Sequence, residues 1–457
     1  MEITQHTLSQ KEAKFDASEL FFSITSPDST ILSGNEVFFR ISGYSREETI
    51  GRYHNVVRHS DMPRVFFKIL WDYAGAGKPI AGYVKNRTKE GDYYWVFAAL
   101  FPLKDRIVSI RIKPTGPLLT AAQELYPILL DAERRGGMEE SGAMIAPILN
   151  TLGYQNYEEF MSDALLHELK GRQRLVSSEG MHVSDASLSP IRQRLAAVYR
   201  YTEDLMVKYD SWFEKIDMFN HVKSVFEEKS LILRQVAREV VFLSLNASVS
   251  SYKVEHGGET FAILARDVRT NAKENDELIE KIDVLVHELS DSLNAMIFSV
   301  SGVRLQSEML NYFIRELMCE NCKVEHHEIE SNMDTLITLV SEYAHKTDSL
   351  QRLIDQQMRD VLKNLDQLEQ QMMYLGYIQV YGIIEAAGSQ NETVSFEGIF
   401  SQLKTLIAKT SQELEAMQKF GGNFSAENRL LMGQSVSIQH LLDALCNEIK
   451  SIKQMER

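Results

Sequence analysis

Two short segments carry side chains that could bind a flat ligand with a polar edge and a phosphate. The first, HNVVRHSDMP at 54–63, contains His54, Asn55, Arg58, His59 and Asp61. The amides of Asn55 and of Asn86 in the second segment offer donors and acceptors. Arg58 and His59 offer positive charge for a phosphate, and Trp71 offers apolar ring surface. The same residues have plainer uses, because Asp61-Met62-Pro63 would also cap and start a helix and Trp71 would also fill a core.

Short β-like runs and turns surround these segments and must position them. The runs lie at 20–24, 82–85, 93–100 and 107–112, bounded by Pro-Asp, Lys-Glu-Gly-Asp and Lys-Asp turns. Helical pieces at 35–41 and 63–73 lie between them. We therefore expect residues 1–117 to form a small α+β domain with an antiparallel sheet.

Within this domain, GYSREETIGRYHNVVRHSDMP (43–63) and GYVKNRTKEGDYYWV (82–96) together resemble the PAS domain of the Aer-type aerotaxis receptors. Ser60 stands where that family usually has proline, and Glu90 where asparagine is common. The resemblance implies a PAS fold that binds FAD without a covalent link. It implies these cofactor-binding residues: His54, Asn55, Arg58, His59, Asp61, Trp71, Asn86 and Trp95.

Two alternatives concern the cofactor. Haem is the rival ligand, because His54 or His59 could serve as an axial ligand. A light-driven flavin–cysteinyl adduct is excluded in this domain, since Cys319, Cys322 and Cys446 all lie outside it.

The chain after the first domain is predicted to be mostly helical. Residues 118–176 read as three short connector helices, with breaks at Gly136-Gly137 and Gly153, and a linker follows at 177–190. The fold class expected for the whole chain is thus an α+β PAS domain followed by a mostly α, long antiparallel coiled coil or helical bundle.

The coiled-coil prediction rests on heptads. Apolar residues recur every seven positions from Leu205 to Ala247, and again from Phe261 to Leu310 with one polar exception. This spacing predicts a helical hairpin at 191–325 with its tip near 255–259.

Residues 326–457 are also predicted to be helical, with breaks near 388–393 and at 421–423. When the sequence around Phe396 is aligned with that around Phe261, the two predicted turns that precede these residues also align. A second hairpin, as a decayed internal repeat, is one interpretation, and chance similarity between helical turns is the other.

The hairpin tip, LSLNASVSSYKVEHGGETFAILARDVRTNAKE at 243–274, resembles that of the methyl-accepting chemotaxis proteins. The resemblance implies self-association through the bundle and docking to a chemotaxis-type histidine kinase with its coupling adaptor, or a diverged equivalent. The tip residues expected to meet a partner are Asn246, Lys253, Glu255, His256, Glu259, Phe261 and Arg269. Several depart from the family: Lys253 replaces arginine, Glu255 glycine, His256 glutamate and Glu259 arginine. A plain structural coiled coil is the alternative.

Composition excludes several classes of partner. The formal net charge is -15, which argues against nucleic acid and against an anionic membrane surface. No apolar run is long enough to span a membrane, and the N-terminus has no signal-peptide pattern, so we expect a cytoplasmic protein. Cys319-x-x-Cys322 followed by His326 and His327 has ligand types for zinc or redox chemistry, but chance and core packing explain it as well.

Together these features favour a sensor over an enzyme. PAS-bound FAD would bias the helical hairpin in response to redox state, oxygen or energy supply. The sequence has no glycine fingerprint for a nicotinamide donor and no hydrolase motif, so catalysis is not expected. The alternative is a PAS-containing scaffold or adaptor whose receptor-like hairpin does not control a chemotaxis kinase.

Overall fold

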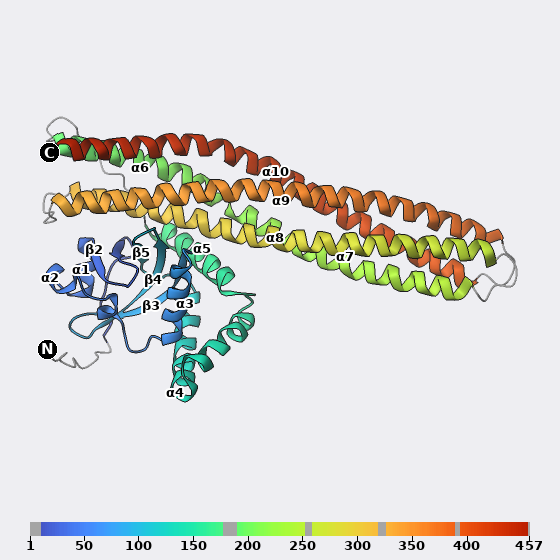
Figure 1. The fold of residues 1–457 in the computed structure, drawn as a ribbon, viewed down its shortest axis with the longest axis horizontal. Coiled ribbons are helices and arrows are strands. Elements are labelled where there is room, and N and C mark those ends of the chain that lie inside the picture. Colours follow the sequence, from blue (N-terminus) through green and yellow to red (C-terminus); the bar gives the residue numbers. More distant parts are fainter. Residues whose placement is uncertain (1–10, 177–189, 252–257, 319–325, 389–393, 456–457) are drawn as a thin grey trace. The chain divides into compact units, whose positions relative to one another are not determined.

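The computed structural model describes residues 11–176, 190–251, 258–318, 326–388 and 394–455. The N-terminal domain contains a five-stranded antiparallel sheet in the order β2-β1-β5-β4-β3. Its strands are β1 (Phe21–Thr25), β2 (Ile31–Gly34), β3 (Ile80–Arg87), β4 (Tyr93–Pro102) and β5 (Ile107–Ile112). Three helices, α1 (Glu36–Ser42), α2 (Arg46–Thr49) and α3 (Arg64–Gly75), and the 3-10 turn η1 (His54–Val57) lie between β2 and β3 (Figure 1).

The expected antiparallel α+β domain is confirmed, and the four predicted strands are present with small shifts of their ends. The sequence prediction missed β2, a short edge strand. Both faces of the sheet are buried: Ser23 and Ser109 on one face, and Phe22 and Val108 on the other, are at most 5% exposed. A sheet covered on both faces lacks the apolar–polar alternation that identifies a half-exposed strand.

Local caps start and end the helices around the predicted motif. Gly43 ends α1 in the left-handed region, at φ 74°, which glycine adopts without a steric penalty. Ser45 then begins α2 with a capping box, in which its hydroxyl accepts from the Glu48 N–H and the Glu48 carboxylate accepts from the Ser45 N–H.

Two further helices follow the sheet. Helix α4 (Leu118–Thr151) is kinked at Gly136 and Gly137, where the backbone leaves helical geometry, and α5 (Tyr157–Leu175) starts at an Asn156 cap. The breaks predicted at Gly136-Gly137 and Gly153 are therefore confirmed. The linker predicted at 177–190 lies outside the described residues, except for Pro190.

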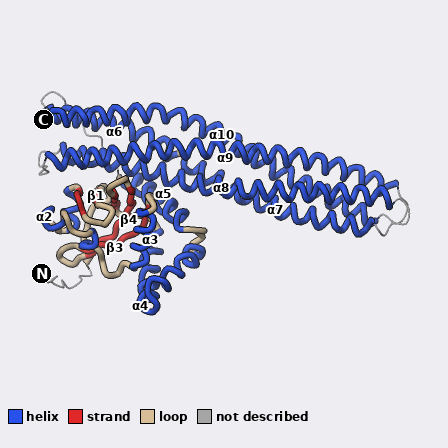
Figure 2. The backbone as a smooth tube through the Cα atoms, viewed as in Figure 1, coloured by secondary structure: helices blue, strands red, loops and turns tan. Residues whose placement is uncertain are grey.

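The remaining described residues form five long helices (Figure 2). They are α6 (Pro190–Glu214), α7 (Ile216–Ser251), α8 (Gly258–Met318), α9 (His326–Gly388) and α10 (Val394–Met455). By its contacts the chain divides into two compact units. Unit 1 comprises 1–214, 294–348 and 434–457, and unit 2 comprises 215–293 and 349–433. The helices α8, α9 and α10 thus each contribute to both units.

Unit 2 is a bundle of four helical segments, from α7, α8, α9 and α10. The predicted heptad positions are buried in it, as Phe226, Leu233 and Ile282 show. Across α7 and α8, Asp283 accepts from the Ser230 hydroxyl at 2.8 Å and pairs with Arg234 at 2.9 Å.

The sequence alignment of Phe396 with Phe261 agrees with the packing of unit 2. These two rings, 135 residues apart, stack with centroids 4.2 Å apart and planes at 20°. Other pairs at the same spacing are both buried: Phe219 and Ile354, Leu233 and Leu368, Val240 and Leu375, Val268 and Leu403, Ile282 and Met417, Leu289 and Phe424. The α7–α8 and α9–α10 segments of unit 2 therefore share one burial pattern.

The break predicted at 421–423 is wrong, because α10 continues through it. Gly421 faces the bundle interior: a Cβ there would lie 2.8 Å from Leu362 Cδ2 and 3.1 Å from Phe226 Cζ. This glycine gives neighbouring side chains room to approach the helix and does not end it. The break near 388–393 falls mostly outside the described residues.

Candidate functional site

The N-terminal domain encloses a cavity of about 250 Å³ between α3, the η1 turn and one face of the sheet. Apolar walls come from Phe67, Leu70, Trp71, Val84 and Leu100. Polar groups come from Ser23, Thr25, Ser29, His54, Asn55, Arg58, Asn86, Ser109 and Arg111. Five of the eight residues expected to bind cofactor, His54, Asn55, Arg58, Trp71 and Asn86, therefore line one cavity.

A buried cation occupies the sheet side of this cavity. The Arg111 guanidinium donates to the Ser23 hydroxyl at 3.0 Å, to the Ser109 carbonyl at 3.3 Å and to His54 Nε2 at 2.6 Å. Burial lowers the pKa of Arg111 to about 10, which leaves it protonated at neutral pH. Burial, and then the charge of Arg111, lower the pKa of His54 to about 3. His54 is therefore neutral, with its proton on Nδ1.

This contact bears on the haem alternative. Because Nε2 of His54 accepts a hydrogen bond from Arg111, that nitrogen is not free to coordinate iron. His59, the other candidate, does not line the cavity.

Arg58 also lines the cavity. Its guanidinium lies 4.4 Å from the centre of the Phe67 ring and donates to the Met62 carbonyl at 2.9 Å. A backbone bridge joins Arg58 to Asn86, which fixes η1 against β3. The Ser109 hydroxyl is buried without a hydrogen-bond partner, so the cavity holds a polar group ready for a ligand.

The structure does not bring His59, Asp61 or Trp95 to the cavity. His59 is 4% exposed, and its Nδ1 accepts from the Asp61 N–H at 3.1 Å, while Asp61 pairs with Lys85 at 2.7 Å. Trp95 points to the other face of the sheet, because Ala98 and Leu100 on the same strand point inward. Its ring lies 6.0 Å from that of Tyr126 in α4.

Sequence reasoning missed Arg111 and Ser109. The signal was present in IVSIRI, where a serine and an arginine alternate with apolar residues at the spacing of one strand face. A charged side chain in an otherwise apolar strand marks a face that needs a polar partner.

Comparison with known proteins identifies this domain. Residues 31–110 match the family model described as the PAS fold. The N-terminal domain is a PAS domain. The aerotaxis receptor of Escherichia coli (strain K12) is 40% identical over 112 residues, which are 23% of this chain and 22% of that receptor. This chain thus spans less than a quarter of that relative.

Solved structures similar to the PAS domain include two LOV domains. That of the Erythrobacter litoralis EL346 blue-light activated histidine kinase is 18% identical, covering 20% of this chain and 94% of that one, with a TM-score of 0.20. The light-state LOV structure of the blue-light photoreceptor Aureochrome1 is 23% identical, covering 22% of this chain and 90% of that one, with a TM-score of 0.21.

The outer face of the PAS sheet packs against the long helices of unit 1. The Phe22 ring meets Phe313 of α8 edge-on at 5.3 Å, and the Phe101 ring meets Tyr343 of α9 edge-on at 5.2 Å. The Tyr343 hydroxyl also donates to the Pro102 carbonyl at 3.4 Å. The sheet therefore separates the cavity from α8 and α9 by the thickness of one strand layer.

A carboxylate of α8 holds the start of α1. Glu316 accepts from the Glu36 N–H at 2.8 Å and from the Asn35 amide at 3.0 Å. Asn35 in turn accepts from the Phe22 N–H at 3.1 Å. Burial raises the pKa of Glu316 above its ordinary value.

Buried ion pairs make a second connection in unit 1. Arg172 of α5 is 3% exposed, donates to the Ala17 and Ser18 carbonyls and pairs with Glu308 of α8 at 2.8 Å. Arg304 lies one turn before Glu308 on α8 and pairs with Asp210 of α6 at 2.6 Å. Arg172 thus joins the N-terminal segment of the PAS domain to α8, and α8 is joined in turn to α6.

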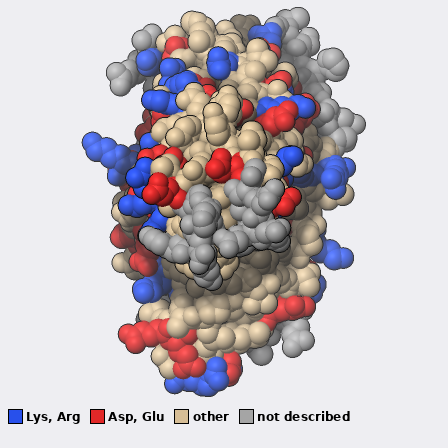
Figure 3. All heavy atoms as spheres, turned by 90° about the vertical axis from the view of Figure 1, so that its right-hand side faces the viewer, with Lys and Arg blue, Asp and Glu red and all other residues tan. Residues whose placement is uncertain are grey.

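The predicted tip residues are only partly described. Asn246, Glu259 and Arg269 are exposed, whereas Phe261 is fully buried against Phe396 and packs inside unit 2. Lys253, Glu255 and His256 lie outside the described residues. In the view of Figure 3, described acidic and basic side chains are interspersed, unlike the continuous basic surface that nucleic-acid binding needs.

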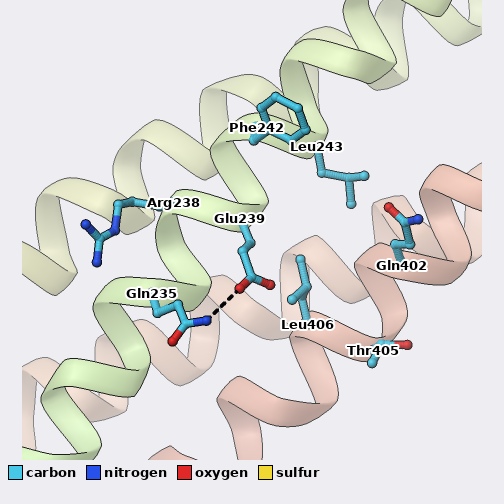
Figure 4. A pocket seen from close by; sticks show the side chains of 8 residues that line it. All are labelled: Gln235, Arg238, Glu239, Phe242, Leu243, Gln402, Thr405 and Leu406. Carbon is cyan, nitrogen blue, oxygen red and sulfur yellow. Dashed lines mark hydrogen bonds between the residues drawn. The ribbon is translucent and has the colours of Figure 1, made fainter.

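An open groove of about 520 Å³ lies between α7 and α10 of unit 2. In Figure 4, Phe242 and Leu243 of α7 lie across from Gln402, Thr405 and Leu406 of α10, and Gln235 donates to Glu239 at 3.0 Å. Phe242 is 65% exposed, so this groove lacks the enclosure of the PAS cavity.

The remaining expectations concern metal and membrane. The described residues contain no group of three His, Cys, Asp or Glu side chains placed to hold a metal. Cys319 and Cys322 lie outside the described part of the chain. Within that part, no helix combines the length and the apolar character that crossing a membrane requires.

Proposed function

We propose that this protein is a cytoplasmic redox, oxygen or energy sensor, in which FAD bound without a covalent link in the PAS cavity controls the helices packed on the sheet. The observation that carries this proposal is the cavity itself, where five residues of the aerotaxis-receptor-like motif meet. The 40% identity to the PAS region of the aerotaxis receptor supports it.

The cavity suits the ring system of a flavin. A flat apolar ring would pack between Phe67, Leu70 and Trp71. Asn55 and Asn86 would pair with its amide-like edge, since each amide can both donate and accept. The unpartnered Ser109 hydroxyl and the nearby Arg111 would complete the polar side.

The chain's own residues would register the state of the ligand. A bound flavin would supply a redox change that alters the charge and the hydrogen bonds of its edge. Arg111 is well placed to respond, because Ser23 on β1 and Ser109 on β5 both bond to it. No substrate turnover is needed, only a different stability for two arrangements of the helices.

Transmission would follow the alternation of strand residues. Ser23 faces the cavity while its neighbour Phe22 contacts Phe313, and Leu100 faces the cavity while its neighbour Phe101 contacts Tyr343. A shift of either strand would therefore reach α8 or α9 without an intermediate layer.

The output we propose is control of a chemotaxis-type histidine kinase and its coupling adaptor, or of a diverged equivalent, by the receptor-like hairpin. The altered charges at the hairpin tip favour a diverged partner. Glu259 stands where the chemotaxis proteins have arginine, and a like-charge contact with the usual kinase or adaptor would lower the affinity. The alternative, a scaffold that controls no kinase, is supported by the same charge reversal at Glu259.

An absorbance spectrum of the purified protein tests the cofactor proposal. We expect the bands of oxidised flavin and release of FAD on heating. Asn86→Ala and Arg58→Ala should each lower the flavin retained per chain. A Soret band, or a protein that stays colourless after incubation with FAD, would refute the proposal.

Co-sedimentation with a chemotaxis kinase and adaptor tests the output. We expect weaker kinase recovery than with an ordinary receptor, and higher recovery with Glu259→Arg. Recovery equal to that of an ordinary receptor and unchanged by Glu259→Arg would show that the turn has no such effect. Absence of recovery from both proteins would favour the scaffold.

A further inference from the structure

An open groove adjoins the PAS cavity. This groove has a volume of about 790 Å³, and Ser29 and Trp71 line both spaces. The inner cavity alone, at about 250 Å³, is smaller than the roughly 300 to 1,000 Å³ typical of small-molecule sites. A ligand larger than one ring system would therefore extend past Trp71 into the groove.

The groove has walls from two parts of unit 1. The PAS domain supplies the 27–29 loop, the end of α3 and the turn between β4 and β5, including Lys104. Helix α9 supplies Glu342 and Lys346. The hydrogen bond and ring contact between Tyr343 and the end of β4 hold this part of α9 against the turn.

The charges in the groove are available to a ligand. Among the described residues, Lys104 and Lys346 have no carboxylate within 4 Å, and the Lys346 ammonium lies 4.3 Å from the centre of the Tyr343 ring. Glu342 is exposed one turn before Lys346 on the same helix, without pairing to it. Asp28, the remaining acidic residue, already accepts from Ser26 and Thr30 in its own turn.

We propose that the groove holds the adenosine diphosphate half of FAD. The ammonium groups of Lys104 and Lys346 would bind the diphosphate, as cations do for phosphate oxygens. The Glu342 carboxylate would accept from a ribose hydroxyl, which is a donor that suits an anionic acceptor. Helix α9 thereby becomes part of the cofactor site, and the chain selects FAD over flavins that lack the nucleotide.

This inference rests on the proposed function, since it requires a flavin ring in the inner cavity. The two separate in one experiment. Flavin is removed from the full chain, and the dissociation constants of FAD and riboflavin are measured by fluorescence titration for the wild type and for Lys346→Ala. Lys363→Ala is the matched control, because Lys363 is an exposed lysine of α9 that does not line the groove.

We expect the wild type to bind FAD at least about tenfold more tightly than riboflavin. Lys346→Ala should weaken FAD binding about tenfold, the effect of one charge-assisted hydrogen bond, and leave riboflavin binding unchanged. Unchanged riboflavin binding also shows that the variant folds. Lys363→Ala should alter neither constant.

Equal affinity of the wild type for FAD and riboflavin would overturn the groove assignment while leaving the flavin proposal intact. So would FAD binding by Lys346→Ala as tight as that of the wild type. A wild type that binds neither flavin would overturn both proposals.

Discussion

Gly421 and Gly422 are adjacent in α10 but have opposite surroundings, so their substitution by alanine provides a matched test of the packing in unit 2. A Cβ at Gly421 would lie 2.8 Å from Leu362 Cδ2, 3.0 Å from Met358 Sδ and 3.1 Å from Phe226 Cζ, whereas a Cβ at Gly422 would meet nothing within 4 Å.

Gly422→Ala should raise the free energy of unfolding, and Gly421→Ala should not. Replacing a helical glycine by alanine gains roughly 1 kcal/mol of helix propensity at either position. At Gly421 the added methyl overpacks the core, which typically costs about 1 to 3 kcal/mol. We therefore expect Gly422→Ala to stabilise the chain by up to about 1 kcal/mol, and Gly421→Ala to leave it unchanged or up to about 2 kcal/mol less stable.

Urea unfolding of the full chain, followed by circular dichroism, measures this difference as a separation of the two midpoints. Met358 is flexible and can move away, so the Leu362 and Phe226 contacts decide the size of the effect. Equal stabilisation by both substitutions would refute the close packing around Gly421. The helix break predicted at 421–423 would then have to be considered again.

Three further predictions concern unit 1. Because the pKa of His54 is lowered in the folded state, the unfolded state binds a proton first as the pH falls. The contribution of His54 to the free energy of unfolding is therefore full above about pH 6.5 and falls toward pH 3 by at most about 1.4 kcal/mol per pH unit. His54→Gln should make the urea midpoint depend less on pH between pH 7 and 5. Trp71→Ala should lower the flavin retained after gel filtration several-fold, and Trp95→Ala on the opposite sheet face should not; equal losses would contradict the cavity assignment. Glu316→Ala removes the acceptor of the Glu36 N–H, so hydrogen exchange at that amide should accelerate at least about tenfold, and exchange at the wild-type rate would show that the contact is dispensable.

The sequence predicted much of the PAS domain because its motif residues lie close together along the chain. The assignment of Trp95 shows where that reasoning ends. In the run Tyr93-Tyr94-Trp95, every residue is aromatic, so composition does not reveal which of them points inward. Only the pairing of β4 with its neighbours fixes the alternation, and that pairing depends on residues far apart in sequence.

Distance along the chain explains the other omissions. Glu342 and Lys346 reach the PAS groove from a helix more than 200 residues away, and no local pattern connects them to Trp71. The glycines at 421 and 422 were misread for a related reason: glycine usually interrupts a helix, and only the neighbouring Phe226 and Leu362 show why one is needed here.

The shared burial pattern of unit 2 does not make its two hairpins equivalent in the size of their interior side chains. Two identical hairpins from separate copies of one gene product would have to accept every substitution twice. Here each hairpin is encoded separately, and the side chains in their interiors differ in size. Phe226 lies against Gly421, while the positions 135 residues away from these two are Val361 and Val286; likewise Gly382 lies against Phe400, while the corresponding positions are Ala247 and Ala265. The first contact joins the two hairpins and the second lies within the α9–α10 hairpin, and the equivalent positions carry side chains of other sizes, so neither hairpin could replace the other in this bundle without new close contacts or gaps.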